Sequence, residues 1–157
     1  MDYLIRPLTA ADEPLLWEML YHGIHGGGSD APAPDIVQRP EFARYVAGWG
    51  REGDSGFVAH DPGQDNKPLG AAWFRFPESE LAGHHKRVPE LAFAVRSEHR
   101  RRGIGAALLT YLVKSDPDCS AVLIRVARDN PTVRLYERFG FKVVEERDDS
   151  VLMRRDV

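Results

Sequence analysis

The hydrophobic and polar positions along the chain follow two rhythms, and each rhythm predicts a different kind of secondary structure. Short apolar or alternating runs predict strands, and they lie at residues 3–6, 56–60, 69–76, 90–95, 121–126, 141–146 and 150–153. Apolar residues at helical spacing predict helices, and they lie at residues 9–20, 35–49, 103–114 and 131–139. A chain that mixes both kinds of element in this way is predicted to have an α/β fold.

Residues that cap or interrupt helices mark several of the predicted ends. Thr9 to Asp12 has the form of a capping box, and Pro14 indicates that the regular helix begins a few residues after Thr9. Asn130 and the proline after it predict the start of the last helix, and Gly140 predicts its end. The last helix is therefore well marked at both ends.

The order of the predicted elements indicates how the strands pair. Residues 90–95, 103–114 and 121–126 form a strand, a helix and a strand, which is a crossover unit whose two strands should lie parallel. Runs separated by turn-rich residues predict antiparallel hairpins over residues 56–76 and 141–153. We therefore expect a sheet with both parallel and antiparallel pairs.

The composition limits the kinds of protein that the chain can be. It has 157 residues, 43% of them hydrophobic, which predicts a single globular domain over residues 1–157. The 21 Lys and Arg residues against 24 Asp and Glu residues give a net charge of −3, which argues against a nucleic-acid partner. The one cysteine, Cys119, permits neither a disulfide within the chain nor a thiolate zinc cluster, so we expect no metal.

The sequence contains no pattern typical of a membrane span or a secretion signal. No run approaches the roughly 20 apolar residues that a transmembrane helix needs. Residues 1–7 lack the basic and apolar regions of a signal peptide. Because a lone cysteine also suits a reducing compartment, we expect a cytoplasmic protein without a membrane partner.

The most informative stretch for chemistry is the predicted strand-to-helix junction within residues 95–109. Three consecutive arginines, Arg100 to Arg102, precede Gly103 and Gly105 there. A helix N-terminus presents unpaired N–H groups and a partial positive charge, and glycines let an anion approach the main chain. The junction therefore predicts a phosphate-binding site, with a solvated basic patch as the alternative interpretation.

Two common phosphate loops do not fit this junction. The Walker pattern requires Gly-Lys followed by Ser or Thr, and the sequence does not contain it. The dinucleotide fingerprint requires a third glycine, where this chain has Leu108. A nucleotide-binding switch is therefore disfavoured, and the lack of a Gly-x-Ser-x-Gly motif disfavours a hydrolase.

Two motifs in the second half of the chain resemble those of one enzyme superfamily. The pattern Arg100-x-x-Gly103-x-Gly105, between an apolar strand and an Ala/Leu-rich helix, resembles the acetyl-CoA signature of the GNAT N-acetyltransferases. The segment Asn130 to Phe141 resembles their second signature, in which an asparagine opens a short helix that ends in a tyrosine and a Gly-Phe strand entry. The resemblance covers about residues 89–141.

The resemblance implies a fold, a reaction and a set of partners. The fold would be a GNAT-like mixed sheet, mostly antiparallel with a central parallel pair, flanked by about four helices. The reaction would move the acetyl group of acetyl-CoA directly to a primary amine in a ternary complex, without a metal. Acetyl-CoA and an amine acceptor would be the partners, and a homodimer is compatible with the resemblance because similar proteins are commonly dimeric.

The resemblance also implies which residues contact acetyl-CoA. Main-chain groups of Phe93 and Val95 would pair with the pantetheine amides like an added strand, and amides at the helix entry would hold the pyrophosphate. Asn130 would contact the pantetheine arm, while Arg128 or Arg134 would lie either near the adenosine phosphate or simply on the surface. The expected cofactor-binding residues are Phe93, Val95, Arg100, Arg101, Arg102, Gly103, Ile104, Gly105, Ala106 and Asn130.

Acetylation of an amine requires a group that removes a proton from it. An alkyl amine of pKa about 10.4 is mostly protonated near neutrality, so a base or a water chain must act before or during attack. The resemblance makes Glu90 the expected base, acting through ordered water. The alternatives are that Glu90 caps a strand end or pairs with Arg96 or Lys86, and that His84 or His85 is the base.

The departing sulfur requires a proton in turn. A tyrosine hydroxyl of pKa about 10 stays protonated at neutral pH and can supply one. The resemblance assigns this catalytic role to Tyr136. The alternative is an ordinary half-buried aromatic side chain beside Leu135 and Phe139.

The acceptor is the least defined part of the prediction. By the resemblance, residues 21–35 and 77–88 would form the acceptor side, and long side chains in the first segment favour a small molecule. Polar and aromatic residues form either a partly acidic pocket for a cationic amine or a scattered surface: Trp17, Tyr21, His22, His25, Glu78 and Glu80. The alternatives to a small-molecule enzyme are a protein N-terminal or lysine acetyltransferase and a non-catalytic acetyl-CoA-binding regulatory domain.

Overall fold

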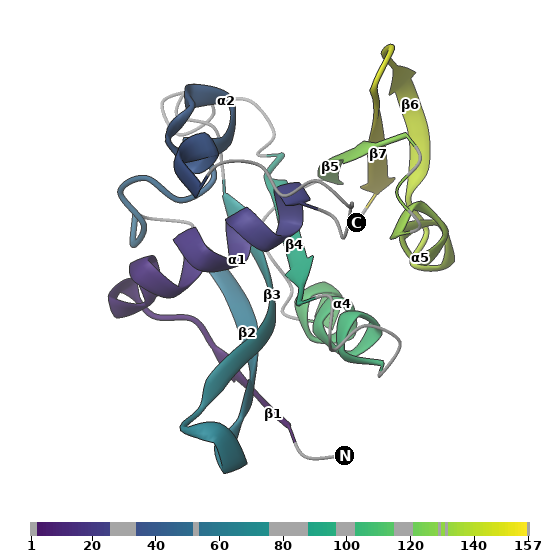
Figure 1. Ribbon diagram of the computed structural model, residues 1–157. Helices are drawn as coiled ribbons and strands as arrows, with labels where there is room; N and C mark the ends of the chain where they lie inside the picture. The colour runs from purple at the N-terminus through teal and green to yellow at the C-terminus, as the bar shows by residue number, and fades with distance from the viewer. Residues whose placement is uncertain are drawn as a thin grey trace.

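Among the described residues, seven strands form one sheet in the computed structural model, in the order β1-β2-β3-β4-β5-β7-β6 (Figure 1). The structure describes residues 3–25, 34–51, 54–75, 88–96, 103–114, 121–128, 130 and 132–156. The strands are β1 (Leu4–Pro7), β2 (Ser55–Asp61), β3 (Lys67–Arg75), β4 (Glu90–Val95), β5 (Ala121–Ala127), β6 (Lys142–Glu146) and β7 (Ser150–Asp156). The α-helices are α1 (Glu13–His25), α2 (Pro40–Ala43), α4 (Ile104–Lys114) and α5 (Thr132–Arg138).

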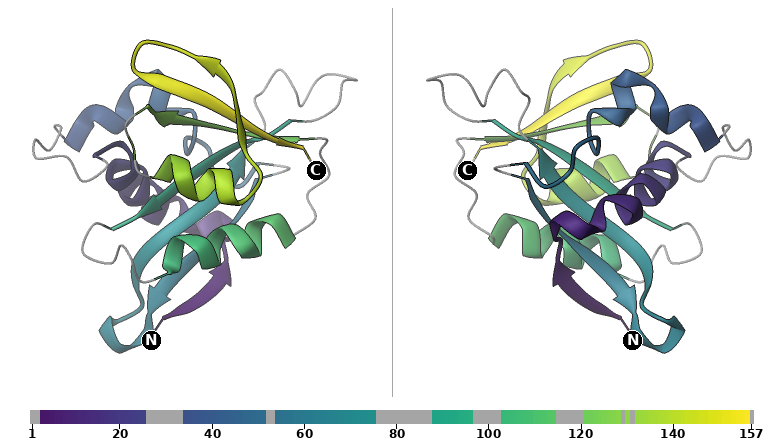
Figure 2. Two further views of the ribbon diagram at one scale, coloured as in Figure 1. Left: turned by 90° about the vertical axis from the view of Figure 1, so that its right-hand side faces the viewer. Right: turned by 90° about the vertical axis from the view of Figure 1, so that its left-hand side faces the viewer.

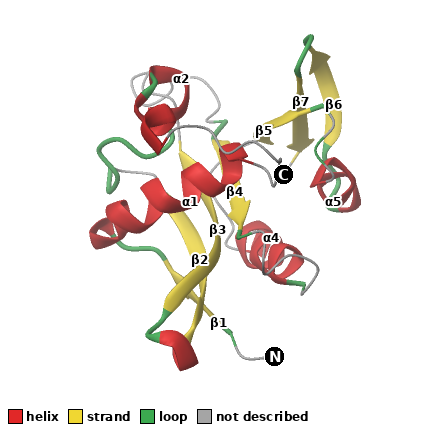
Figure 3. Ribbon diagram, in the orientation of Figure 1, coloured by secondary structure: helices red, strands yellow, loops and turns green. Residues whose placement is uncertain are grey.

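Helices cover both faces of the sheet, as Figures 2 and 3 show. α1 and α2 lie on one side, which we call the α1 face, and α4 and α5 lie on the other, which we call the α4 face (Figure 2). Side chains of β4 alternate between two hydrophobic clusters: Leu91 and Val95 pack on the α4 face, and Ala92 and Ala94 pack on the α1 face. The alternation thus assigns each position of β4 to one face.

The predicted pairing of the strands is confirmed. β2 and β3 form an antiparallel hairpin, as do β6 and β7, and β4 and β5 are parallel on either side of the α4 crossover. β7 lies between β5 and β6, so the C-terminal strand fills the interior position and β6 forms the edge. The fold is the mixed, mostly antiparallel α/β sheet that the sequence predicts.

The prediction of a single helix over residues 35–49 is wrong. The structure has a short 3₁₀ helix at Pro34–Gln38 and the one-turn helix α2, separated by Arg39 in an extended conformation (φ −65°, ψ 139°). The cause is Pro40, because proline disfavours a helical conformation in the residue before it and has no N–H to donate.

The predicted capping box before α1 is confirmed. The Asp12 carboxylate accepts a hydrogen bond from the Thr9 backbone N–H at 2.7 Å and two from the Arg6 guanidinium at 2.8 and 2.9 Å. A 3₁₀ turn over Ala10–Asp12 follows, and the regular helix begins at Glu13, as expected from the proline after it. The side-chain hydrogen bond from Arg6 holds the pKa of Asp12 below its usual value, against the opposing effect of burial.

β4 and β5 diverge after a single point of contact. Within the described residues, Glu90 and Leu123 are the pair that joins them, and the Leu123 N–H donates to the carbonyl of Pro89 at 3.0 Å. β4 pairs with β3 along its whole length, from Glu90 to Val95. We call the region beyond the Glu90–Leu123 pair the β4–β5 opening, and Figure 1 shows the two strands running apart there.

Candidate active site

The N-terminal end of α4 follows a glycine in the left-handed backbone region. Gly103 has φ +80°, and its carbonyl accepts from the Ala107 N–H at 3.0 Å. A Cβ at Gly103 would have no neighbour within 4 Å among the described residues, which leave this point open. The N–H groups of Ile104, Gly105 and Ala106 lie in the first turn, where a helix supplies no acceptors of its own. This end of α4 thus presents the donors that the sequence predicts for an anion.

Gly105 lies close to side chains of β4 and α5, a constraint that the sequence did not indicate. A Cβ at Gly105 would lie 2.8 Å from Cζ of Phe93 and 3.4 Å from the Leu135 side chain. The missing side chain therefore makes room for the Phe93 ring, which crosses from β4 to the first turn of α4. The expected approach of an anion to the main chain at Gly105 stays a prediction.

The backbone of β4 presents hydrogen-bonding groups to the β4–β5 opening at alternate residues. The Arg96 N–H donates to Leu69 on β3 at 2.9 Å, whereas the Pro89 carbonyl accepts from β5. Because these groups alternate in direction along a strand, the N–H and C=O of Phe93 and Val95 face away from β3 and toward β5. The resemblance predicts that these two residues pair with the pantetheine amides, and their orientation agrees with that prediction.

Tyr136 lies on α5 and faces the sheet. It is 2% exposed, and its ring meets Phe93 and Phe141 with centroid distances of 5.7 and 5.9 Å. Burial raises the pKa of the Tyr136 hydroxyl above its ordinary value, and a hydrogen bond with the Thr132 side chain opposes this only in part. Tyr136 is therefore a neutral phenol, which is the form needed to donate a proton.

Asn130 caps α5, as its position before the helix predicts. Its Oδ1 accepts hydrogen bonds from the backbone N–H of Thr132 at 2.9 Å and from the Thr132 hydroxyl at 2.7 Å. A contact with the pantetheine arm would therefore use the amide nitrogen of Asn130. Arg128 bonds to the Arg147 carbonyl and lies 3.7 Å from Glu146, which favours the surface interpretation of this arginine.

Glu90 lies on the α1 face, and its two carboxylate oxygens are held by donors from the segment after α2. Arg44 donates to Oε1 at 3.1 Å and to Oε2 at 3.0 Å, and the hydroxyl of Tyr45 donates to Oε2. The Glu90 side chain is only 14% exposed. The alternative pairing with Arg96 is wrong, because Arg96 bonds elsewhere.

A second charged pair lies beneath the first. Arg75 is the register partner of Glu90 on β3, and its buried guanidinium contacts the buried Asp54 at 3.2 Å and donates to the Arg44 carbonyl at 3.2 Å. The pair thus supports the backbone that carries Arg44 and Tyr45. The sequence shows one signal for it, an arginine at the end of the apolar run that forms β3.

Arg96 joins the end of β4 to α1. Its Nε donates to the Pro68 carbonyl at 2.6 Å, Nη1 lies 3.0 Å from Nε2 of His22, and Nη2 bonds to Glu18. Trp17 on α1 donates to Glu13 at 3.2 Å. Trp17 and Tyr21 are partly buried and pack against the α1-face cluster.

Several residues singled out from the sequence lie outside the part of the chain that the structure describes. They are Arg100, Arg101, Arg102, Glu78, Glu80, His84, His85, Lys86, Cys119 and the side chain of His25.

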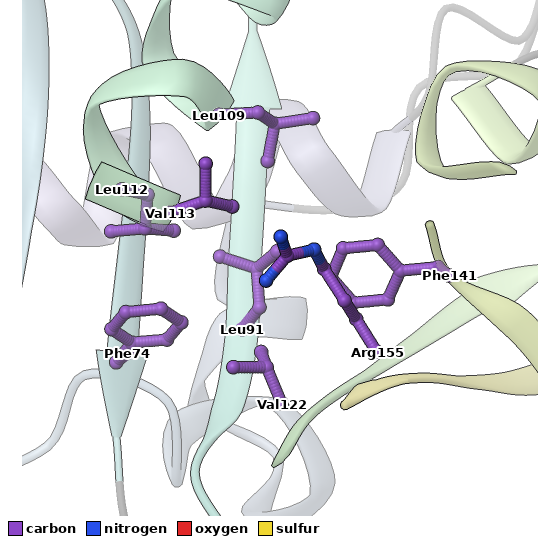
Figure 4. A pocket seen from close by; sticks show the side chains of 8 residues that line it. All are labelled: Phe74, Leu91, Leu109, Leu112, Val113, Val122, Phe141 and Arg155. Carbon is purple, nitrogen blue, oxygen red and sulfur yellow. The ribbon is translucent and has the colours of Figure 1, made fainter. Parts of the chain in front are cut away.

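A small apolar cavity lies on the α4 face, next to the point where β4 and β5 meet (Figure 4). It is lined by Phe74, Leu91, Leu109, Leu112, Val113, Val122, Phe141 and Arg155. The guanidinium of Arg155 reaches toward its centre, while Nε donates to the Phe139 carbonyl at 2.7 Å (Figure 4). Glu90 and Tyr136 do not line this cavity, so it is separate from the proposed chemistry.

The arrangement places the Tyr136 phenol and the Glu90 carboxylate on opposite faces of one opening in the sheet. Tyr136 and the N-terminus of α4 lie on the α4 face, and Glu90 lies on the α1 face. Two reactants that approach from the two faces could meet between β4 and β5.

Among the described residues no group of three or more His, Cys, Asp or Glu side chains could hold a metal, and no helix there is long and apolar enough to cross a membrane.

Comparisons with known proteins agree with this geometry. A model described as the acetyltransferase (GNAT) family matches residues 26–141. No curated protein sequence matches the chain significantly.

Solved structures of similar fold cover the whole chain. A PaiA N-acetyltransferase from Thermoplasma acidophilum with coenzyme A has 17% identity and a TM-score of 0.71, with 100% of both chains covered. NAA60 of Arabidopsis thaliana with acetyl-CoA has 21% identity and a TM-score of 0.66, covering 99% of this chain and 98% of that one. A ribosomal-protein-alanine N-acetyltransferase from Brucella melitensis has 20% identity and a TM-score of 0.67, covering 98% and 99%.

Proposed function

The chain belongs to the acetyltransferase (GNAT) family, and from this premise we propose that it transfers the acetyl group of acetyl-CoA directly to a primary amine of a small molecule. The observation that supports this most strongly is the β4–β5 opening, with Tyr136 on one face and Glu90 on the other. Because the two faces allow two substrates to bind at once, we infer a ternary complex without a covalent enzyme intermediate.

The residues of the α4 face fit acetyl-CoA. The first-turn amides of α4 suit a diphosphate, and the open space at Gly103 gives it access to the main chain. The backbone groups of Phe93 and Val95 that face the opening suit an extended chain of amides. When bound, acetyl-CoA supplies an activated acyl carbon and a thiol leaving group.

Tyr136 holds the proton that the leaving group needs. Its burial keeps the hydroxyl neutral, so the proton remains on the phenol oxygen at physiological pH. The edge-to-face contact with Phe93 fixes the ring between α5 and β4. Tyr136 therefore acts as a general acid in this proposal.

Glu90 removes a proton from the acceptor amine in the same proposal. Arg44 and Tyr45 orient the carboxylate, and the buried pair Arg75 and Asp54 supports the backbone that carries them. Because the donors already engage both oxygens, we expect the proton to reach Glu90 through a bridging water.

The burial of Glu90 supports a small acceptor. Arg44 and Tyr45 cover it from the α1 face, so a bulky protein segment would have to displace them to bring an amine close. A peptide amino terminus is the second acceptor to test, because one similar structure is that of a ribosomal-protein-alanine N-acetyltransferase. The cytoplasmic location expected from the sequence is part of the proposal.

The test is release of free CoA thiol from acetyl-CoA with small primary amines and with peptides. We expect thiol release above the hydrolysis background with small amines and none with peptides. Release with peptides alone would replace the proposal by a protein acetyltransferase. Stabilisation by acetyl-CoA in a thermal-shift assay without thiol release from any acceptor would indicate a regulatory domain.

A further inference from the structure

We propose that Arg125 binds a carboxylate of the acceptor, so that the substrate class is a small primary amine that also carries a carboxylate. This inference rests on the proposed function and concerns the α1 face of the same opening. It names a residue that neither the motifs nor the resemblance singles out.

The register of β5 places Arg125 beside the opening on the α1 face. Leu123 is the parallel partner of Glu90, and paired residues point to the same face of a sheet. Arg125 lies two residues further along β5, about 7 Å at 3.3 Å per residue, and therefore on the same face. The intervening residues with the opposite orientation pack in the α4-face cluster: Val122, Ile124 and Val126.

The guanidinium of Arg125 has a buried donor that the described protein does not satisfy. Its Nη1 atom is buried and has no hydrogen-bond partner among the described residues. The residue as a whole is partly exposed. An unsatisfied buried donor destabilises the protein, and arginine is charged at all physiological pH values. An acceptor substrate that placed an anion beside Nη1 would supply the missing hydrogen bond and remove this destabilisation.

Several neighbouring charges on the α1 face are already paired. The described ion pairs there join Glu90 to Arg44, Asp54 to Arg75, Glu18 to Arg96 and Asp156 to Arg154. Arg125 has no such partner in the described part of the chain, so its positive charge has no counter-charge among those residues. The acidic residues expected in the acceptor pocket, Glu78 and Glu80, lie outside the described residues, so that expectation stays a prediction.

One guanidinium matches one carboxylate in both charge and shape. Its planar fork can donate two parallel hydrogen bonds to the two carboxylate oxygens. A phosphate dianion beside Arg125 would leave one negative charge unbalanced. With Arg125 on the β5 side of the opening and Glu90 on the β4 side, an amino-carboxylate can place its two ends against the two residues.

Arg125 does not belong to the acetyl-CoA side of the site. The N-terminus of α4, Phe93 and Tyr136 all lie on the α4 face, and the register places Arg125 on the other face. An anion of the cofactor held by the first turn of α4 is therefore separated from Arg125 by the sheet.

The first experiment measures kcat and KM for an amino acid, for the same molecule with its carboxylate amidated, and for the amino phosphonate analogue. We expect the carboxylate to have the lowest KM, and Arg125→Gln to raise that KM about 10- to 100-fold while the KM of the amide and kcat change little. Arg125→Lys should recover part of the loss. Arg154→Gln is the matched control, since Arg154 lies opposite Leu123 on the same face and already has Asp156 as a partner.

Equal KM values for the acid and the amide in the natural protein would overturn the inference without any variant. Preference for the phosphonate would overturn the carboxylate assignment. An equal rise in KM for acid and amide in Arg125→Gln would mean that the arginine is only structural.

A second experiment separates this inference from the proposed function. An N-acetylated amino acid is titrated calorimetrically into the CoA-saturated protein, where we expect binding by the natural protein and about 10- to 100-fold weaker binding by Arg125→Gln. If no amine supports thiol release but this difference is found, the proposed function fails and the carboxylate site stands. If the natural protein does not bind the acetylated compound, the inference fails.

Discussion

The rings of Phe93 and Tyr136 meet edge to face, with their centroids 5.7 Å apart and their planes at 80°. Phe93 comes from β4 and Tyr136 from α5, so this contact bridges the two sides of the β4–β5 opening on the α4 face. The same Phe93 ring fills the space left by the missing side chain of Gly105. The position of the proposed acid therefore depends on the first turn of α4.

Replacement of Gly105 by Glu should abolish stabilisation by acetyl-CoA. Its Cβ would lie 2.8 Å from the Phe93 ring, and the added carboxylate would repel a diphosphate at the first turn of α4. The measurement is a thermal-shift titration with acetyl-CoA, with NAD and ATP as ligands that we expect to have no effect. A full shift in Gly105→Glu would show that the diphosphate binds elsewhere.

Replacement of Gly103 by Ala should lower the stability of the ligand-free protein by about 1–2 kcal/mol, because a side chain is strained in the left-handed region. Gly103 has φ +80°. Gly105→Ala is the comparison, and we expect it to cost less, since the far end of the Phe93 ring can shift and alanine favours a helix. Urea unfolding of both variants measures the difference. An equal loss in the two would contradict this explanation.

Replacement of Tyr136 by Phe should preserve acetyl-CoA binding and lower kcat about 100-fold, as expected for loss of a general acid. Because burial raises the pKa of Tyr136, the natural enzyme should show no fall in kcat from ionisation of this group below about pH 10. Thiol release measured across the pH range tests both statements. Tyr111→Phe is the control, because Tyr111 is 48% exposed on α4. Unchanged turnover in Tyr136→Phe would remove this residue from the mechanism.

Replacement of Glu90 by Gln should lower kcat/KM about 100-fold near neutral pH. The deficit should shrink as the pH approaches about 10.4, where the amine loses its proton without help. Glu18→Gln is a matched control, since Glu18 also lies on the α1 face but bonds to Arg96. A deficit that is constant with pH would mean that Glu90 positions the acceptor rather than removing its proton.

Replacement of Asp12 by Asn should lower stability by about 1 kcal/mol at neutral pH, because the capping box and the Arg6 pair lose their charge. Arg6 lowers the pKa of Asp12 in the folded protein, so the contribution is present above the unfolded value of about 3.9 and is lost as the pH falls through the lower folded value. The difference in Tm between the two proteins should therefore disappear in acid. Asp148→Asn, at an exposed position, should show no such difference.

Local signals predicted much of this structure, and the reasons are visible in particular residues. Gly103 and Asn130 act within a few residues of their own positions, so their roles at the two helix ends follow from the sequence. Pro40 also acts locally, but the prediction for residues 35–49 rested on apolar spacing alone and did not use this proline.

The groups around Glu90 could not be predicted in the same way. Arg44 is 46 residues away from Glu90 in the chain, and Arg75 meets Asp54 across 21 residues. Such contacts depend on how β3, β4 and the segment after α2 pack, which periodicity and spacing do not encode. Gly105 was identified correctly as a constrained glycine, but the ring that constrains it becomes visible only when β4 and α4 are placed together.

Among the described residues one backbone pair joins β4 to β5, so the sheet consists of two parts with a short contact between them. A ligand bound between these two parts would supply backbone hydrogen bonds that β4 and β5 do not make to each other. Its binding free energy would add to the free energy of unfolding. The concentration of acetyl-CoA would then affect the resistance of the protein to proteolysis as well as its catalytic rate.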